Sequence, residues 1–174
     1  MTTTSPAQTA GPYWHLIDHP EWADLLREQP GHPPMTLTGR ITDGDDQPCG
    51  DAMVELWQAG PDGAHERGFH GFGRCAADTD GVFRFTTTRP GPVPGPGNSL
   101  QAPHFTLAIF ARGLMHHVTT RAYLTAEPLN EADPILALVP EARRGTMLAR
   151  LTATDVWTLD IRLQGADETV FLDI

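Results

Sequence analysis

His104 stands where a proline-rich loop meets a predicted strand, and it is the first residue placed to do chemistry. Five prolines fall between Arg89 and Leu114, a spacing that excludes a helix or a central strand in the first half of this stretch. From Pro103 to Phe110 polar and apolar residues alternate, which predicts a strand with one apolar face and His104 on the other. Because a rigid loop that leads into a strand can fix a side chain accurately, we expect a site here.

The other histidines do not complete a metal site by their spacing. A catalytic metal needs about three protein ligands and an open position. His116 and His117 are adjacent, so on a strand they would face opposite sides, and we expect a structural or surface role. His65 and His70 lie in the glycine-rich connection 59–71, where solvent exposure is the default. Taken by themselves, the residues favour a polar role for His104 with its hydrogen bonds satisfied.

Arg112, in the turn after this strand, is the most suggestive cation. An arginine on a loop can pair with a carboxylate through two hydrogen bonds, or it can be an exposed turn charge, and its spacing leaves both open. Cys49 and Cys75 lack a C-x-x-C spacing, so we predict buried, reduced thiols. The sequence also lacks the G-x-S-x-G, phosphate-loop and H-E-x-x-H motifs of common hydrolases and nucleotide-binding proteins.

Composition indicates a single globular domain over residues 1–174. Twelve basic against 22 acidic residues argue against a nucleic-acid partner, which requires a basic surface. No apolar run approaches the ~20 residues of a membrane span, and the first residues lack the basic and apolar regions of a signal peptide. We therefore expect a cytoplasmic protein with no membrane partner.

The elements that must position these residues are predicted to be mostly strands. Seventeen glycines and 16 prolines punctuate short alternating runs, a pattern typical of an all-β sandwich. Helical spacing predicts two short surface helices, at 21–28 and 140–149. The predicted strands are 37–41, 52–58, 82–87, 104–110, 116–124, 156–163 and 169–172. The predicted fold class is therefore all-β, a β-sandwich with two short surface helices and an N-terminal arm.

The N-terminal arm, residues 1–15, has turn chemistry but places Tyr13 and Trp14 beside a Gly-Pro pair. An unanchored tail rarely carries two aromatic side chains, because they gain little in solvent. We therefore predict that this segment docks on another surface.

Seven segments of the chain together resemble the intradiol aromatic-ring dioxygenases over nearly its whole length. Each motif is modest alone, but their order and spacing are specific. They are QTAGPYWH (8–15), VELWQAGPDG (54–63), GFGR (71–74), TTRPGPVPG (87–95), APHFTLAIFARGL (102–114), TTRAYL (119–124) and LQGADETVFLDI (163–174). The resemblance implies a β-sandwich core, in agreement with the pattern of strands.

In the family's catalytic chains two tyrosines and two histidines hold Fe(III), and the resemblance implies that this set is incomplete here. His65 and Val93 stand at the two tyrosine positions, and His104 and Thr106 match the H-x-H histidines. Gln101 matches an arginine that precedes H-x-H. Because anionic phenolates stabilise the ferric ion, these vestigial positions are not expected to hold it in the family's manner. No catalytic or metal-ligating residue is expected in this chain alone.

The resemblance is to the alpha chains of two-chain members of the family. It implies a hetero-oligomer of alpha–beta pairs in which Fe(III) is bound by the beta chain. The alpha chain would complete the pocket for a small aromatic substrate and O₂, with 3,4-dihydroxybenzoate cleaved to 3-carboxy-cis,cis-muconate. The pocket and interface residues that the resemblance implies are Thr9, Gly11, Pro12, Tyr13 and Arg112.

Two other hypotheses remain open from the sequence. One is a self-sufficient intradiol dioxygenase with an atypical site that uses His65 and His104. The other is a non-enzymatic β-sandwich binding module that retains only the fold.

Overall fold

The structure is a computed structural model, and it describes residues 11, 13–29, 31–65 and 68–173. The strands are β1 (Met35–Thr42), β2 (Met53–Gln58), β3 (Phe72–Ala76), β4 (Val82–Thr87), β5 (Val93–Pro94), β6 (Leu100–Gln101), β7 (His104–Phe110), β8 (Val118–Leu124), β9 (Leu148–Ala153), β10 (Val156–Thr158) and β11 (Ile161–Arg162). The helical segments are α1 (Glu141–Arg144) and the 3-10 turns η1 (Trp14–Ile17), η2 (Pro20–Ala23), η3 (Pro96–Asn98), η4 (Pro128–Ala132), η5 (Leu136–Leu138) and η6 (Gly145–Met147). No helix in these ranges is long and apolar enough to cross a membrane.

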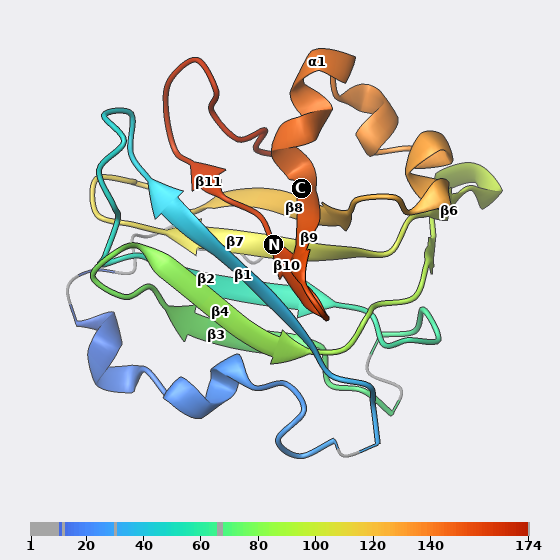
Figure 1. Cartoon of the computed structure of the whole chain (residues 1–174), viewed down its shortest axis with the longest axis horizontal. Coiled ribbons are helices and arrows are strands. Elements are labelled where there is room, and N and C mark those ends of the chain that lie inside the picture. Colours follow the sequence, from blue (N-terminus) through green and yellow to red (C-terminus); the bar gives the residue numbers. More distant parts are fainter. Residues whose placement is uncertain (1–10, 12, 30, 66–67, 174) are drawn as a thin grey trace, which may run out of the picture.

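The strands form one long sheet that folds back on itself, and this confirms the predicted β-sandwich. Its order is β11-β1-β10-β9-β8-β7-β2-β3, and β4 pairs with β1 outside that path. Figure 1 shows the β1–β4 pair lying across the layer of β3, β2, β7 and β8. The two-stranded β5–β6 ribbon lies within the proline-rich loop. Residues of β1 and β4 share one core cluster with residues of β2, β7 and β8, so the two layers pack face to face.

Strand β7 decides which side chains face the core. Phe105, Leu107 and Ile109 are fully buried, while the residues between them are only partly covered. The buried set packs in the same cluster as Phe83 and Phe85 of β4. This confirms the predicted apolar face and leaves His104 and its neighbours on the outer face of the layer.

The two predicted helices are shorter than expected, because tertiary hydrogen bonds compete with the helical ones. The segment 21–28 keeps only η2 and then turns, since the Leu25 N–H donates to Thr86 O at 2.9 Å. In 140–149 the chain forms α1 and η6, then enters β9 at Leu148, where Leu148 pairs with Tyr123 of β8. A helix running through Leu148 would leave that edge of β8 unpaired.

The C-terminal strands also differ from the prediction. The predicted strand 156–163 is split into β10 and β11, and between them the Leu159 N–H donates to Thr38 O at 2.9 Å. A Cβ on Gly39 would lie 1.8 Å from Leu159 O, so this close crossing requires glycine at that position. Residues 169–172 form no strand ladder, although the Leu172 N–H donates to Thr119 O at 2.7 Å. Strands β3, β5, β6 and β9 were not expected from the sequence.

Gln58 joins the two layers, and its loss is predicted to weaken the sandwich. Its side-chain nitrogen donates to Ala59 O and Thr88 O, both at 3.1 Å, and its oxygen accepts from the Thr87 hydroxyl at 2.5 Å. Gln58→Leu removes these bonds in a buried place and is expected to lower the free energy of unfolding by about 1–3 kcal/mol in a urea titration. The exposed Gln164→Leu is the control, and an equal loss in both variants would contradict this role for Gln58.

Candidate functional site

The predicted site residues occupy two places on the outer face of the β3–β2–β7–β8 layer, near opposite ends of β7. His104 begins β7, and Arg112 lies in the turn after Phe110, where β7 ends. Six residues of extended strand separate His104 from Phe110, a distance of about 20 Å. The structure therefore separates Arg112 from the vestigial metal-site positions.

A series of contacts links the four vestigial positions around β7 on this face. Thr106 of β7 pairs in register with Trp57 of β2 on one side and with Arg121 of β8 on the other. The His65 ring stacks on Trp57, with centroids 5.7 Å apart and planes inclined by 9°. Thus His65 and Thr106, 41 positions apart in the chain, have a common neighbour.

Val93 and His104 belong to the same group of positions, from the proline-rich loop and the start of β7. Val93 is buried and pairs with Gln101 in the β5–β6 ribbon. His104 faces Tyr123, with ring centroids 5.6 Å apart, and its Nδ1 lies 2.7 Å from Ala102 O. A carbonyl oxygen only accepts, so Nδ1 carries the proton.

This donor set does not fit the Fe(III) on which the family depends. Two imidazoles, a buried valine and a hydroxyl replace the phenolate-rich set, and the Arg121 guanidinium adds a positive charge beside them. Within the described ranges no group of three or more His, Cys, Asp or Glu residues is arranged to hold a metal ion. We therefore derive no catalytic step through a metal in this chain.

The stability of the folded chain depends on pH through His104, and this dependence can be measured. Burial, and after it the charge of Arg121, lower the pKa of His104 to about 4 from its usual 6.5. Between pH 6.5 and 4 the unfolded chain binds a proton that the folded chain does not, so His104 costs stability progressively as the pH falls. We compare the free energy of unfolding of His104→Gln with that of wild type at each pH. This difference is expected to shift in favour of the variant, by on the order of 1–2 kcal/mol, between pH 7.5 and pH 4.5.

Thermal unfolding of both proteins at the two pH values checks this. The exposed His116→Gln is the matched control, and a difference between wild type and His104→Gln that does not change with pH would contradict the expected behaviour.

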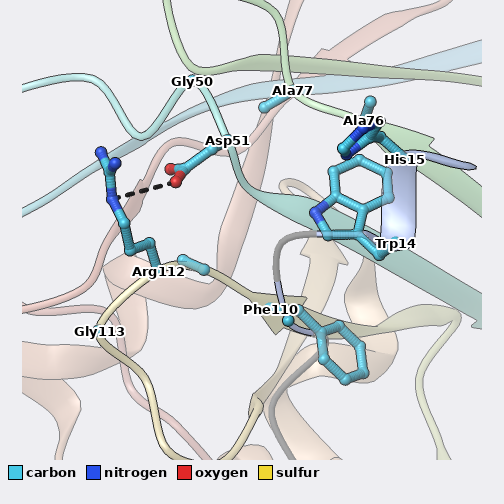
Figure 2. Close-up of a pocket in the computed structure, with 11 residues that line it drawn as sticks. Trp14, His15, Gly50, Asp51, Ala76, Ala77, Phe110, Arg112 and Gly113 are labelled. Atoms are coloured by element: carbon cyan, nitrogen blue, oxygen red, sulfur yellow. Dashed lines mark ion pairs between the residues drawn. The ribbon is translucent and has the colours of Figure 1, made fainter.

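The second place is a cavity of about 690 Å³ beside Arg112 (Figure 2). Its lining comes from the N-terminal segment, the loop before β2, the end of β3 and the end of β7 with its turn. The lining residues are Gly11, Trp14, His15, Gly50, Asp51, Ala76, Ala77, Phe110, Ala111, Arg112 and Gly113. The structure thus brings Arg112 together with Gly11, two of the residues that the resemblance assigns to a pocket shared with a partner chain.

Arg112 proves to be both an exposed turn residue and a partner of a carboxylate. Its side chain is 86% exposed, and its Nε lies 3.2 Å from Oδ2 of Asp51 across the mouth of the cavity (Figure 2). An exposed pair of this kind contributes little to stability. A guanidinium has five N–H donors, so a contact at Nε is compatible with binding a second anion.

Exposed apolar side chains lie on the segments that line the cavity or adjoin it. Tyr13 and Leu16 are 73% and 71% exposed, and Met115, just after the turn of Arg112, is 80% exposed. Burying such apolar side chains against a partner surface is favourable, so their exposure agrees with the predicted docking of the arm. Thr9 and Pro12 of the predicted interface lie outside the described residues.

Other expectations from the sequence need correction. His116 and His117 lie in the turn before β8 rather than on a strand, and both are exposed. Cys49 and Cys75 are free thiols, but they are only partly buried. His65 and His70 are both exposed, as predicted.

Sequence reasoning missed Asp51, Arg121, Tyr123 and Asp133. A signal existed for two of them, because Arg121 and Tyr123 are two residues apart in a predicted strand and therefore share a face. Their partner strand also presents His104 and Thr106 on that face. For Asp51 and Asp133, which lie in loops, no local pattern was available.

Comparisons with known proteins agree with this geometry. A family model described as "Dioxygenase" matches residues 9–165. The protocatechuate 3,4-dioxygenase alpha chain of Burkholderia cepacia is 34% identical, with all of both chains covered. The corresponding beta chain of that organism is 29% identical over 78% of this chain and 66% of its own length.

The solved structures that are similar to this chain include a dioxygenase domain. The dioxygenase domain of a dioxygenase–carbohydrate-binding fusion from Streptomyces sp. SirexAA-E superposes with a TM-score of 0.67 at 28% identity, covering 92% of this chain and 98% of the other. The matched family model spans most of the chain, and the full-length relative exceeds 30% identity. The chain therefore belongs to the intradiol dioxygenase family.

Proposed function

We propose that this chain is a non-metallated alpha-type subunit of a protocatechuate 3,4-dioxygenase, a single domain over residues 1–174 that pairs with an iron-bearing beta-type chain. The observation that carries the proposal is the state of the family's ligand positions. Val93 is buried and apolar, and Thr106 lies next to a guanidinium rather than a metal ligand. The similarity to an alpha chain over its full length supports the same role.

In this role the chain contributes pocket wall, charge and assembly, while Fe(III) belongs to the partner. The substrate, 3,4-dihydroxybenzoate, is an anion at neutral pH. Arg112 stands exposed at the mouth of a cavity, where its guanidinium can bind a carboxylate and so orient the ring. The overall reaction opens the ring with O₂, between its two hydroxyl-bearing carbons, and gives 3-carboxy-cis,cis-muconate.

The N-terminal arm and the β7–β8 turn are the surface that we assign to the partner. We include Thr9, Gly11, Pro12 and Tyr13 in it, with Arg112. The free thiols of Cys49 and Cys75 are compatible with a reducing cytoplasm, where we place the assembly.

Co-expression with the beta-type chain tests the proposal. Oxygen uptake with 3,4-dihydroxybenzoate and the mass of the assembly are measured for this chain alone, for the partner alone and for the two together. We expect the isolated chain to be colourless and inactive, and the co-expressed pair to co-purify and turn over. Stoichiometric iron and turnover in the isolated chain would instead support a self-sufficient enzyme. Failure of any iron-bearing chain to co-purify would favour a binding module.

A further inference from the structure

Arg121 contacts the vestigial positions or their direct partners. It pairs in register with Thr106, and its Nη1 donates to Gln101 Oε1 at 2.7 Å and to the Tyr123 hydroxyl at 3.3 Å. Gln101 is itself the strand partner of Val93. In the described part of the chain, Nε of Arg121 is buried without a hydrogen-bond partner. A partly buried guanidinium that is only partly satisfied is costly, so its presence requires a reason.

A buried carboxylate lies one hydroxyl beyond this guanidinium. The Tyr123 hydroxyl donates to Asp133 Oδ1 at 3.1 Å, and Tyr123 and Asp133 are both fully buried. Burial raises the pKa of Tyr123 to about 12, so its phenol keeps the proton that it donates. Arg121, Tyr123 and Asp133 thus form a chain in which the cation faces the carboxylate through a neutral phenol.

The same guanidinium braces the proline-rich loop. Gln101 accepts from Arg121 and donates from its Nε2 to Pro94 O at 2.9 Å. Its position is the one at which the family's catalytic chains carry an arginine. In this chain a positive charge stands on β8 instead, where Arg121 donates a hydrogen bond to Gln101.

We propose that Arg121 is a built-in cation among the vestigial positions, which takes the place of a metal ion in holding the loop, β7 and β8 together and which excludes metal ions by its charge. The guanidinium of Arg121 would repel a metal ion bound beside it, because like charges a few ångströms apart in a partly buried site repel strongly. The chain is therefore protected against metal by Arg121 as well as by its missing ligands.

Exchanging the side chains of Arg121 and Gln101 tests whether this part of the structure needs one cation. Arg121→Gln leaves Tyr123 and Gln101 without their donor, and Gln101→Arg places two guanidinium groups together. Each single variant of the full chain is expected to unfold roughly 4–8 °C below wild type. The double variant restores one arginine and one glutamine, and it is expected to return to within about 2 °C of wild type.

The proposal would be overturned if the unfolding temperature of the double variant fell by as much as the falls of the two single variants added together. Arg150→Gln, which changes an exposed arginine of β9, is the matched control and should unfold near the wild-type temperature.

A second experiment tests the exclusion of metal. The three ligand-restoring changes His65→Tyr, Val93→Tyr and Thr106→His are made together, once with Arg121 intact and once with Arg121→Gln. After incubation with Fe(III) and desalting, bound iron per chain and the visible absorption of tyrosinate-bound iron are measured. We expect at least about tenfold tighter iron binding without Arg121.

Equal iron binding by the two proteins would overturn the exclusion. If the restored protein does not fold, the iron measurement is made instead on Arg121→Gln and wild type, and the exchange of Arg121 and Gln101 still decides the holding role. Neither experiment depends on turnover with a partner, so its failure is distinguishable from failure of the proposed alpha-type role.

Discussion

Replacing Arg112 by alanine in the assembled enzyme is expected to lower kcat/KM for 3,4-dihydroxybenzoate by about 10- to 150-fold. This is the loss of about 1.5–3 kcal/mol that accompanies removal of a charge-assisted hydrogen bond. Arg112 is exposed and its ion pair with Asp51 is at the surface, so the change should leave the fold of the chain intact. Catechol, which has no carboxylate, should lose less than about threefold, because it does not form this bond.

Steady-state oxygen uptake with both substrates measures this difference. Arg112→Lys keeps the charge but not the planar fork, and an intermediate loss is expected. Arg150→Ala, an exposed arginine of β9 away from the cavity, is the matched control. An equal loss for the carboxylated and the uncharged substrate would remove Arg112 from the substrate pocket.

Asp133→Ala is expected to lower the free energy of unfolding of the chain by about 3–5 kcal/mol, since it leaves several buried donors unpaired. The fully buried Asp133 accepts four hydrogen bonds from three parts of the chain. The donors are Ala102 N at 2.8 Å, the Tyr123 hydroxyl at 3.1 Å, Ile135 N at 2.9 Å and Leu136 N at 2.8 Å. Urea unfolding of the full chain measures the loss.

Two other variants make this result specific to Asp133. Asp133→Asn keeps one accepting oxygen, so a smaller loss is expected. Asp167→Ala removes an exposed carboxylate and should change stability by less than about 0.5 kcal/mol. A loss below about 1 kcal/mol for Asp133→Ala would show that these donors find other partners.

The elements that the sequence predicted best are those whose pattern is strictly local. β7 alternates over its whole length, and both its limits and its buried face agree with the prediction. The predicted helices failed where a backbone group had a distant partner, such as Leu25 with Thr86. Helical spacing over a few residues is weak, because most of the stability of a short helix comes from packing.

The same distinction between local patterns and contacts of distant residues applies to the candidate site. The resemblance to the family placed the four vestigial positions, and the structure shows contacts that link His65, Val93, His104 and Thr106 through their neighbours. Arg121, which takes part in these contacts, was not singled out. Its significance depends on pairing between β7 and β8 and on an amide in β6, none of which is visible in a local pattern.

The sequence by itself determined the class of fold and the face of β7 that is buried, because both follow from residue type and short spacing. The absence of the phenolate ligands is what the resemblance to the family implied. Only the tertiary structure decided that Arg112 lines a cavity with Gly11 and Asp51, whereas His104, at the other end of β7, packs against Tyr123. It also decided that a guanidinium, tied to Gln101 and Tyr123, stands among the vestigial positions. Contacts between strands depend on register and layer packing, which arise from many weak burial terms acting together and which no single stretch of residues encodes.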